Sequence, residues 1–474
     1  MSVVDVQRGH SCREEPSLLA HVAHACVREQ SSSSFGHTIC RVPWLLVAWR
    51  EVCSALGMNL SKLVSFLFPA AILSASALLA CGADGFAEAK SEDPRALASA
   101  LPQSDRDAWG EGQELLSFEL LSTTKGNAAL SPHSINVAMS MVSNGAGGNT
   151  LAEIEKGLHF LPQDKLHQVM NDVSLALASR ATVDGQEVFA LKEANRIFSE
   201  QTLAVEDPFL STLARYYGAS VGLADFVSDA KGSRDLMNGW VREVTDSHII
   251  DLLPEDAINT DTRMVLINAI YLEAKWSSPF KKSSTRDLPF AAPAGSVQVP
   301  TMRQTHEYLY ADSAEGEMVE LPYKGRLVMD IVIPKVGKTI GAAEFASLRS
   351  SLKTTLVDLA LPKFAIRPLE SLRLKRALQD LGIKQAFETS ADFSGISSAE
   401  RLKIEDVIHR AMVDVQEDGT VASAATAVVA VDAGAASNPP SATVVRVDRP
   451  FQFALRDPST RAVLFIGRVE NPQN

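Results

Sequence analysis

One segment near the C-terminal end limits what this chain can fold into more than any other. Residues 417–440 begin with an acidic turn, and residues 419–431 then contain no charged residue and no proline, only small or β-branched side chains. Such a segment can be a pliable surface loop, because Ala, Ser, Thr and Gly have little to anchor them. It can also be a β-strand, because its second half is rich in Val and nothing interrupts the hydrogen-bond ladder. The composition allows both structures.

As a strand, the segment would carry only small or β-branched side chains on both of its faces. With a period of two, one face carries Thr420, Ala422, Ala424, Thr426, Val428 and Ala430. We expect these small side chains to be able to slide beneath a covering helix. The alternate face, from Val421 onward, carries no large or charged side chain either.

Composition and motifs exclude several classes of protein. The 474 residues, 46% of them hydrophobic, suffice for one large domain or for two or three average ones. A net charge of −12 and the lack of a dense Lys/Arg run argue against nucleic-acid binding. There is no Gly-x-Ser-x-Gly and no His-Glu-x-x-His, and no two histidines after Cys81 have metal-ligand spacing on one helix face. We therefore expect neither an enzyme nor a bound cofactor or metal.

The five cysteines all lie in the first 81 residues, so the remainder of the chain has neither an internal disulfide nor a Cys nucleophile; they are Cys12, Cys26, Cys40, Cys53 and Cys81. Residues 58–81 have the pattern of a secretory signal, with a weakly basic start and an apolar run over 63–77 that is too short to span a membrane. The end of this run, Leu-Leu-Ala-Cys81, resembles the bacterial lipobox. That resemblance implies a lipidated Cys81 and a protein that is anchored to the cell envelope outside the cytoplasm, or secreted.

A signal peptide cannot act from the middle of a chain, so residues 1–57 are interpreted as an over-extended reading frame. The alternative is an unusual soluble N-terminal extension. Residues 82–108 are rich in Ala, Asp, Glu, Pro and Ser without a pattern, which predicts a linker. Residues 109–474 are expected to form the folded domain.

Several elements of that domain can be predicted from local patterns. Helices are expected over 114–123 and 135–144, the second capped by Ser131 and opened by Pro132. An amphipathic helix beginning at Asn238, with His248 in its last turn, and a helix over 369–381 are expected as well. The nearly continuous apolar run over 264–272 predicts a strand buried on both faces, and two strands over 449–455 and 463–472 close the chain.

Three stretches together resemble the serpins, the family of serine protease inhibitors. Glu-x-Gly-Thr-x-Ala-x-Ala-Ala from Glu417 is similar to the serpin hinge, and Ser-Pro-His-Ser-Ile from Ser131 is similar to the start of the second serpin helix. The most specific stretch is Asn-Ala-Ile-Tyr-Leu-Glu-Ala-Lys-Trp from Asn268 to Trp276. The resemblance covers residues 109–472 without a break. It implies an α+β fold with a large central mixed or antiparallel sheet, additional sheets, about eight to nine helices and an exposed reactive loop.

The resemblance also implies roles for matching residues. The family spacing from Glu417 puts the reactive bond at Ala433-Gly434. The shutter, a polar cluster that holds the central strands together, would comprise Ser131, Ser134, Asn268 and His409, and the breach at the top of the sheet would include Trp276 and Arg303. We predict an ion pair between Glu417 and Arg303 that biases the loop outward. The hinge would comprise Glu417, Gly419, Thr420, Ala422, Ser423, Ala424 and Ala425.

The implied function is inhibition of a serine protease, or alternatively a cysteine protease, by cleavage and insertion of the reactive loop. Alanines around the reactive bond suit an elastase-like or subtilisin-like enzyme, and no Lys or Arg lies between Arg410 and Arg446 to suit a trypsin-like one. The competing hypothesis is a non-inhibitory serpin that acts as a binding module. Members of that kind usually have bulky, charged or proline residues in the hinge. We expect a monomer whose partners are the target protease and, through Cys81, a membrane, with no nucleic acid.

Overall fold

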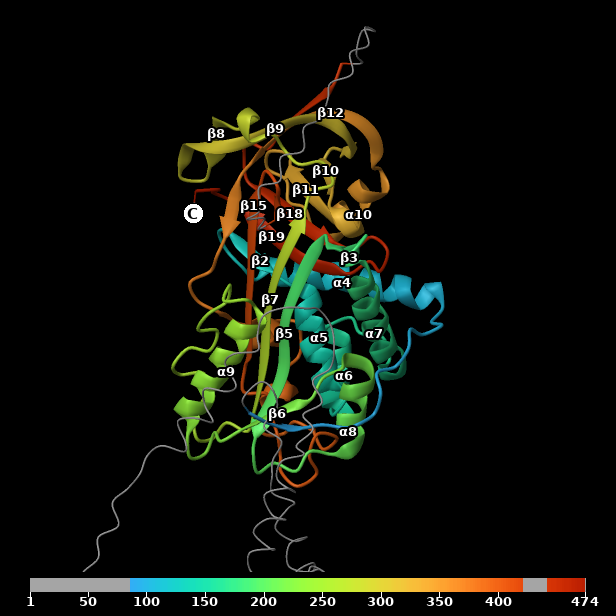
Figure 1. Cartoon of the computed structure of the whole chain (residues 1–474), viewed down its shortest axis with the longest axis vertical. Coiled ribbons are helices and arrows are strands. Elements are labelled where there is room, and N and C mark those ends of the chain that lie inside the picture. Colours follow the sequence, from blue (N-terminus) through green and yellow to red (C-terminus); the bar gives the residue numbers. More distant parts are fainter. Residues whose placement is uncertain (1–85, 421–440, 474) are drawn as a thin grey trace, which may run out of the picture. The chain divides into compact units, whose positions relative to one another are not determined.

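The computed structural model describes residues 86–420 and 441–473. An eight-stranded mixed sheet runs through it (Figure 1). In spatial order its strands are β1 (Ala87–Ala89), β6 (Val221–Ala224), β5 (Phe189–Glu200), β7 (Met264–Lys275), β16 (Gly419–Thr420), β15 (Val407–Gln416) and β13 (Phe364–Ile366), and β14 (Leu372–Arg373) also pairs with β15. β5 is antiparallel to β7, whereas β7 and β15 are parallel where they pair directly. The expected mixed sheet is confirmed.

A second, nine-stranded sheet shares a hydrophobic core with the first. Its strands are, in spatial order, β17 (Thr443–Arg446), β12 (Lys353–Pro362), β9 (Gly295–Asp312), β10 (Gly316–Pro322), β11 (Val328–Pro334), β18 (Phe451–Arg456), β19 (Val463–Val469) and β2 (Ala128–Leu130), with β8 (Arg286–Ala292) paired to β9. β18 and β19 form the antiparallel pair expected at the end of the chain. A small hairpin of β3 (Thr182–Val183) and β4 (Gln186–Glu187) completes the strands in the described residues.

The described residues contain eight α-helices, in line with the expected number. They are α4 (Gln103–Ser122), α5 (Pro132–Ser143), α6 (Gly148–Gly157), α7 (Gln163–Arg180), α8 (Asp207–Thr212), α9 (Ala230–Val244), α10 (Ala342–Ser350) and α11 (Lys375–Asp380). α5 begins as predicted: the Ser131 side chain accepts a hydrogen bond from the Ser134 backbone N–H, and Pro132 occupies the first turn. No helix among these is long and apolar enough to cross a membrane.

β7 is buried on both faces because different elements cover each one. Ile267 and Ala269 pack under α9 with Trp240 and Val241, whereas Ile270 and Leu272 point into the core shared by the two sheets. Figure 1 shows α9 lying along β5 and β7. Side chains on both faces are therefore apolar, which explains the continuous run that predicted this strand.

The segment expected as a linker is structured from Phe86 onward. β1 adds an edge strand to the sheet next to β6, and α4 begins at Gln103, eleven residues before the predicted helix start. Phe86 packs edge-on against Phe198 with 5.0 Å between ring centroids, and the Glu88 carboxylate pairs with Arg196 at 2.8 Å. These contacts are made by distant partners, so the local composition of residues 86–102 did not indicate them.

Two further elements differ from the sequence expectations. The helix predicted over 369–381 is shorter, because residues 372–373 pair with β15 and only α11 is helical. α9 ends at Val244, so His248 lies beyond the helix and stacks on Tyr271 with 3.8 Å between ring centroids. In both places a contact with the large sheet overrides the local helical tendency.

Candidate functional site

The first hinge residues already lie inside the large sheet. β7 and β15 pair directly through six residue pairs, from Leu266–Val407 to Tyr271–Met412, which we call the seam. Beyond the seam β16 separates the two strands: Thr420 lies opposite Ala274 on one side and Val415 on the other. Gly419 has a φ of +153°, and a Cβ at this position would lie 2.0 Å from the carbonyl oxygen of Ala274. Only glycine fits where the chain enters the sheet.

An aromatic and polar cluster holds this entry point. The Trp276 indole N–H donates to the carbonyl of Gln416 at 2.9 Å, and its ring stacks on Tyr323 at 4.0 Å. The Tyr323 hydroxyl lies 2.5 Å from the Thr420 hydroxyl, and both groups are buried. The predicted breach residue Trp276 therefore contacts the hinge strand, and Tyr323, which the sequence analysis did not single out, completes the contact.

The position of Thr420 also tells which face of the segment turns inward. Its side chain meets Tyr323 in the core between the sheets, on the same side as Ala274. By alternation, the even-numbered set from Thr420 would face this core, and the odd-numbered set from Val421 would pass beneath α9. Thr420 itself thus faces the core between the sheets rather than a covering helix. The other members of the set lie outside the described residues, so the expectation for them stays a prediction.

Glu417 lies next to the hinge strand and pairs with Lys363 rather than with Arg303. The Lys363 ammonium is 2.9 Å from the Glu417 carboxylate, and the Thr285 hydroxyl donates to it at 2.7 Å. Burial opposes ionisation of this carboxyl, but the hydrogen bonds from Lys363 and Thr285 outweigh it and hold the pKa of Glu417 below its usual value. The predicted ion pair is wrong in its basic partner.

Arg303 instead belongs to an ion-pair cluster that fastens β17. Its guanidinium is 2.9 Å from the Asp358 carboxylate, and Arg446 on β17 reaches the same carboxylate at 3.0 Å. Burial opposes ionisation, but the hydrogen bonds from Arg446 and Arg303 keep the pKa of Asp358 below its usual value. Arg303 therefore acts on the strand that follows residues 421–440, not on the hinge.

The four residues predicted for the shutter form one buried hydrogen-bond network across the seam. The Asn268 amide N–H donates to the Ser134 hydroxyl at 2.7 Å, and the Asn268 carbonyl oxygen contacts His409 Nδ1. His409 Nε2 in turn accepts from the Ser131 backbone N–H at 3.1 Å. The network thus connects β7, β15 and α5, and all four side chains are buried.

Asn195 on β5 is a fifth member that sequence reasoning missed. Its carbonyl oxygen accepts from the Ser134 hydroxyl at 2.6 Å and from the Asn268 amide at 2.9 Å. The only available signal was an amide residue within an otherwise strand-like stretch. Its partners come from α5 and β7, so the role becomes visible only in three dimensions.

His409 is neutral in this environment. Complete burial lowers its pKa to about 3, which is far below the usual value for histidine. Neutral imidazole has one donor and one acceptor nitrogen, and Nε2 is the acceptor because it faces a backbone N–H. Nδ1 then donates to Asn268, so each ring nitrogen has a partner. The closed seam therefore contains a fully satisfied polar cluster.

A match to a family of known proteins covers most of the chain. The family model described as "Serpin (serine protease inhibitor)" matches residues 112–472. The chain belongs to the serpin family. Two curated relatives are an uncharacterized serpin-like protein of Thermococcus kodakarensis, 34% identical over 79% of this chain and 90% of that protein, and the leukocyte elastase inhibitor of Sus scrofa, 32% identical over 74% of this chain and 94% of that protein. The crystal structure of the thermophilic serpin tengpin in its native state matches with a TM-score of 0.70 and 28% identity, covering 81% of this chain and 99% of that chain.

In this serpin a connector crosses the seam on the side of α9. Residues 245–263 lead from α9 to β7, and the Arg410 guanidinium on β15 donates to the carbonyls of Ile250 at 2.7 Å and Asp251 at 3.3 Å. The same guanidinium reaches the carbonyl of Leu369 at 3.1 Å. A strand that enters the seam has to pass beneath this connector.

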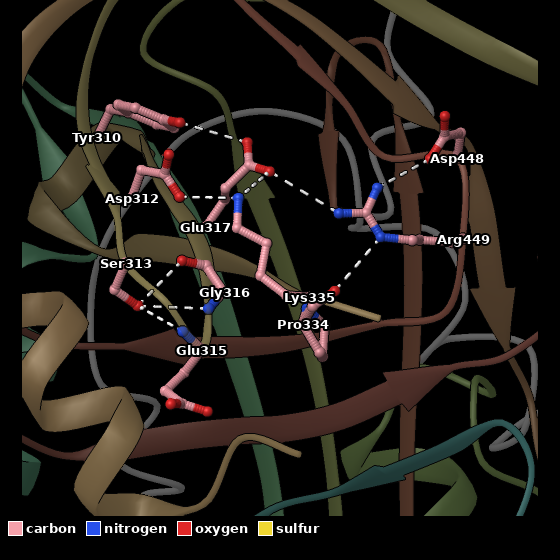
Figure 2. Close-up of polar contacts among 10 residues, drawn as sticks. All are labelled: Tyr310, Asp312, Ser313, Glu315, Gly316, Glu317, Pro334, Lys335, Asp448 and Arg449. Atoms are coloured by element: carbon pink, nitrogen blue, oxygen red, sulfur yellow. Dashed lines mark hydrogen bonds and ion pairs between the residues drawn. The ribbon is translucent and has the colours of Figure 1, made fainter. Parts of the chain in front are cut away.

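The chain after residues 421–440 is fastened at two places. β17 pairs in parallel with β12, and Figure 2 shows a second attachment just beyond it, where Arg449 lies among Asp448, Pro334 and Glu317. Arg449 donates to the Pro334 carbonyl at 3.3 Å, and Glu317 also accepts from Lys335 at 3.0 Å. The described residues on either side of 421–440 are thus fixed, at β16 and at β17.

The remaining predicted hinge residues, the reactive bond Ala433-Gly434 and the lipidation residue Cys81 lie outside the described residues. Their roles therefore stay predictions.

Proposed function

We propose that this serpin inhibits a serine protease by acting as a substrate whose cleaved loop inserts into the large sheet. The observation that carries the proposal is β16: two hinge residues already form an antiparallel strand between β7 and β15. Continued residue by residue, this register sets Val428 opposite Leu266 and Ala433 opposite Asp261, just beyond the start of β7. The segment is therefore long enough to fill the seam from end to end.

The chemistry needs only the protease's own catalytic groups. The protease serine oxygen attacks the carbonyl of Ala433, the bond to the Gly434 nitrogen breaks, and the new amine leaves with a proton supplied by the protease. An ester to Ala433 remains. If the freed loop inserts before water attacks the ester, the protease is carried along the sheet while covalently bound, and distortion of its oxyanion hole stops deacylation.

The driving force for insertion comes from new strand pairing. About thirteen residues that gain ladder hydrogen bonds worth ~0.5–1.5 kcal/mol each provide on the order of 10 kcal/mol. The intact protein would therefore be held kinetically rather than in its most stable fold. Small hinge residues, among them Ala422 and Ala424, support insertion over a purely binding role, because a strand inserted into the sheet is buried and small uncharged side chains displace few neighbours.

Incubation with elastase-like and subtilisin-like proteases tests this function. We expect an adduct that survives denaturation, and small-pocket proteases should form it while a trypsin-like enzyme does not. Thr420→Arg should convert the inhibitor into a substrate, because a guanidinium cannot replace a hydroxyl against Tyr323. Leu369→Arg, on a side chain that is 95% exposed, is the matched control and should inhibit normally. Clean turnover of the unmodified protein would favour the binding-module alternative.

We also propose that the protein acts at a membrane surface through a lipid on Cys81, after removal of residues 58–80. The lipobox-like Leu-Leu-Ala-Cys81 supports this location. Cys81→Ser should move the protein from the membrane fraction to the soluble fraction. A mature chain that contains Cys12 would contradict both this proposal and the interpretation of residues 1–57.

A further inference from the structure

A pocket of about 340 Å³ lies at the end of the seam opposite the hinge. One wall comes from Asp261 and Arg263, shortly before β7. The other comes from Arg401, Leu402, Lys403 and Glu405, shortly before β15, and Thr389 also lines the pocket. These are the two strands that have to separate when a new strand enters between them. The pocket therefore bridges the moving parts of the sheet.

The lining carries three basic and two acidic side chains, in a protein that is acidic as a whole. It contains Arg263, Arg401 and Lys403 against Asp261 and Glu405. Lys403 pairs with Glu405 at 2.7 Å, and Arg263 donates to the carbonyls of Thr260 and Thr262 and pairs with Glu400 at 3.6 Å. Arg401 is exposed and makes no hydrogen bond or ion pair within the described residues. One guanidinium is thus free to bind a ligand in a pocket that Thr389 also lines.

We propose that this pocket binds a phosphate group and thereby holds the seam closed. A guanidinium presents paired N–H donors that match a phosphate, and a second guanidinium and a hydroxyl on the pocket walls supply further donors. The volume suits a small ligand head. A free phosphate and the headgroup of an anionic lipid offer the same chemistry, and the experiment below distinguishes them.

Binding and insertion are coupled because the pocket exists only while the strands are adjacent. Val407 pairs directly with Leu266 in the closed sheet, and an inserted strand would move the two walls apart by about 4.8 Å. A phosphate held by Arg263 and Arg401 would lose one wall. If the open sheet does not bind phosphate, a concentration of ten times the Kd slows insertion about tenfold. This effect on insertion rests on the proposed function, whereas phosphate binding does not.

The binding test uses inorganic phosphate and the full chain, with titration calorimetry at constant ionic strength. Arg401→Ala should weaken phosphate binding at least tenfold, and Asp261→Asn should strengthen it because it removes an anionic group from the pocket. Lys353→Ala, which removes a positive charge from the second sheet, is the matched control and should leave the Kd unchanged. Equal binding by the wild type and Arg401→Ala would overturn the proposal.

Two further arms complete the test. Vesicles of phosphatidylglycerol compared with phosphatidylcholine reveal whether a headgroup binds, and loss of vesicle binding in Arg401→Ala supports the pocket as its site.

The insertion rate is measured with a synthetic peptide of residues 420–432, without any protease. Phosphate should slow its incorporation into the wild type and not into Arg401→Ala; an equal rate with and without saturating phosphate would overturn the coupling. Failure to trap a protease, with these results unchanged, would instead contradict the proposed function.

Discussion

At the scale of single residues, the buried histidines make the closed seam sensitive to acid. Burial lowers the pKa of His409 to about 3, whereas the unfolded chain binds this proton near pH 6.5. The contribution of neutral His409 to the free energy of unfolding is therefore fully present above about pH 6.5, and it is lost progressively as the pH falls toward 3. At pH 5 the loss from this residue is about 2 kcal/mol. His167, whose pKa burial lowers to about 4, acts in the same direction.

Urea unfolding at pH 7.5 and pH 5 measures this effect. His409→Gln should reduce the difference between the two pH values by about 2 kcal/mol, although it also lowers stability at pH 7.5 because the Ser131 N–H and Asn268 lose a partner. His306→Gln, on an exposed side chain, is the control and should leave the difference unchanged. An unchanged difference in His409→Gln would show that this imidazole does not titrate on unfolding.

The same scale shows where sequence reasoning succeeds. The shutter residues and Trp276 could be predicted because each lies in a stretch of this chain that matches a serpin motif. The partner of Glu417 could not, because Arg303 and Lys363 are both basic residues near the hinge, and the choice depends on the register between β9 and β12. That register sets Arg303 beside β17, where Asp358 neutralises it.

At the scale of elements, the register of β16 predicts what an inserted strand would meet. Continued from Thr420, it sets Thr426 opposite Asn268, facing the shutter. A hydroxyl there could replace hydrogen bonds that the network loses when β7 and β15 separate. Thr426→Val should therefore lower the stability of the loop-cleaved protein by about 1–3 kcal/mol and leave the intact protein unaffected. Thr426→Ser, measured by denaturant unfolding of both forms, should behave like the wild type; a loss in the intact form alone would refute this register.

In the proposed mechanism β17 would keep the intact loop from inserting by itself, because the uncut loop could extend along the seam only after β17 leaves β12. Asp358→Asn would weaken the pairs with Arg446 and Arg303. If the substitution weakens the attachment of β17 by about 1 kcal/mol, the intact protein should lose its inhibitory activity at 37 °C about five times faster. Asp312→Asn removes a carboxylate that pairs with Lys335 at the far end of β9 and should not change the rate. Equal inactivation rates in both variants would assign no holding role to Asp358.

Elements with a strong local pattern could be predicted, and those made by distant contacts could not. The apolar run of β7 and the cap of α5 are local signals, and both appear where expected. β1 and β14 are short edge pairings that depend on β6 and β15, so their own residues carry little information. β16 is the instructive case: the residues allowed a loop or a strand, and the structure has a strand for its first two residues.

At the scale of the whole molecule, both ends of the loop are fixed, so we expect a single cut within it to allow a large rearrangement of the sheet. In the proposed mechanism, cleavage at Ala433-Gly434 would leave the far side fastened through β17 and Arg449 and would free the near side to extend β16 along the seam. Gaining on the order of 10 kcal/mol in a domain of this size corresponds to a rise in Tm on the order of 10 °C. Differential scanning fluorimetry before and after limited cleavage measures it. Thr420→Arg, cut at the same bond, should show a much smaller rise, because an arginine does not fit against Tyr323 and β16 would then offer no strand for the rest of the loop to extend. If cleavage leaves the Tm of the unmodified protein where it was, the sheet does not accept the loop, and the inhibitory mechanism is excluded.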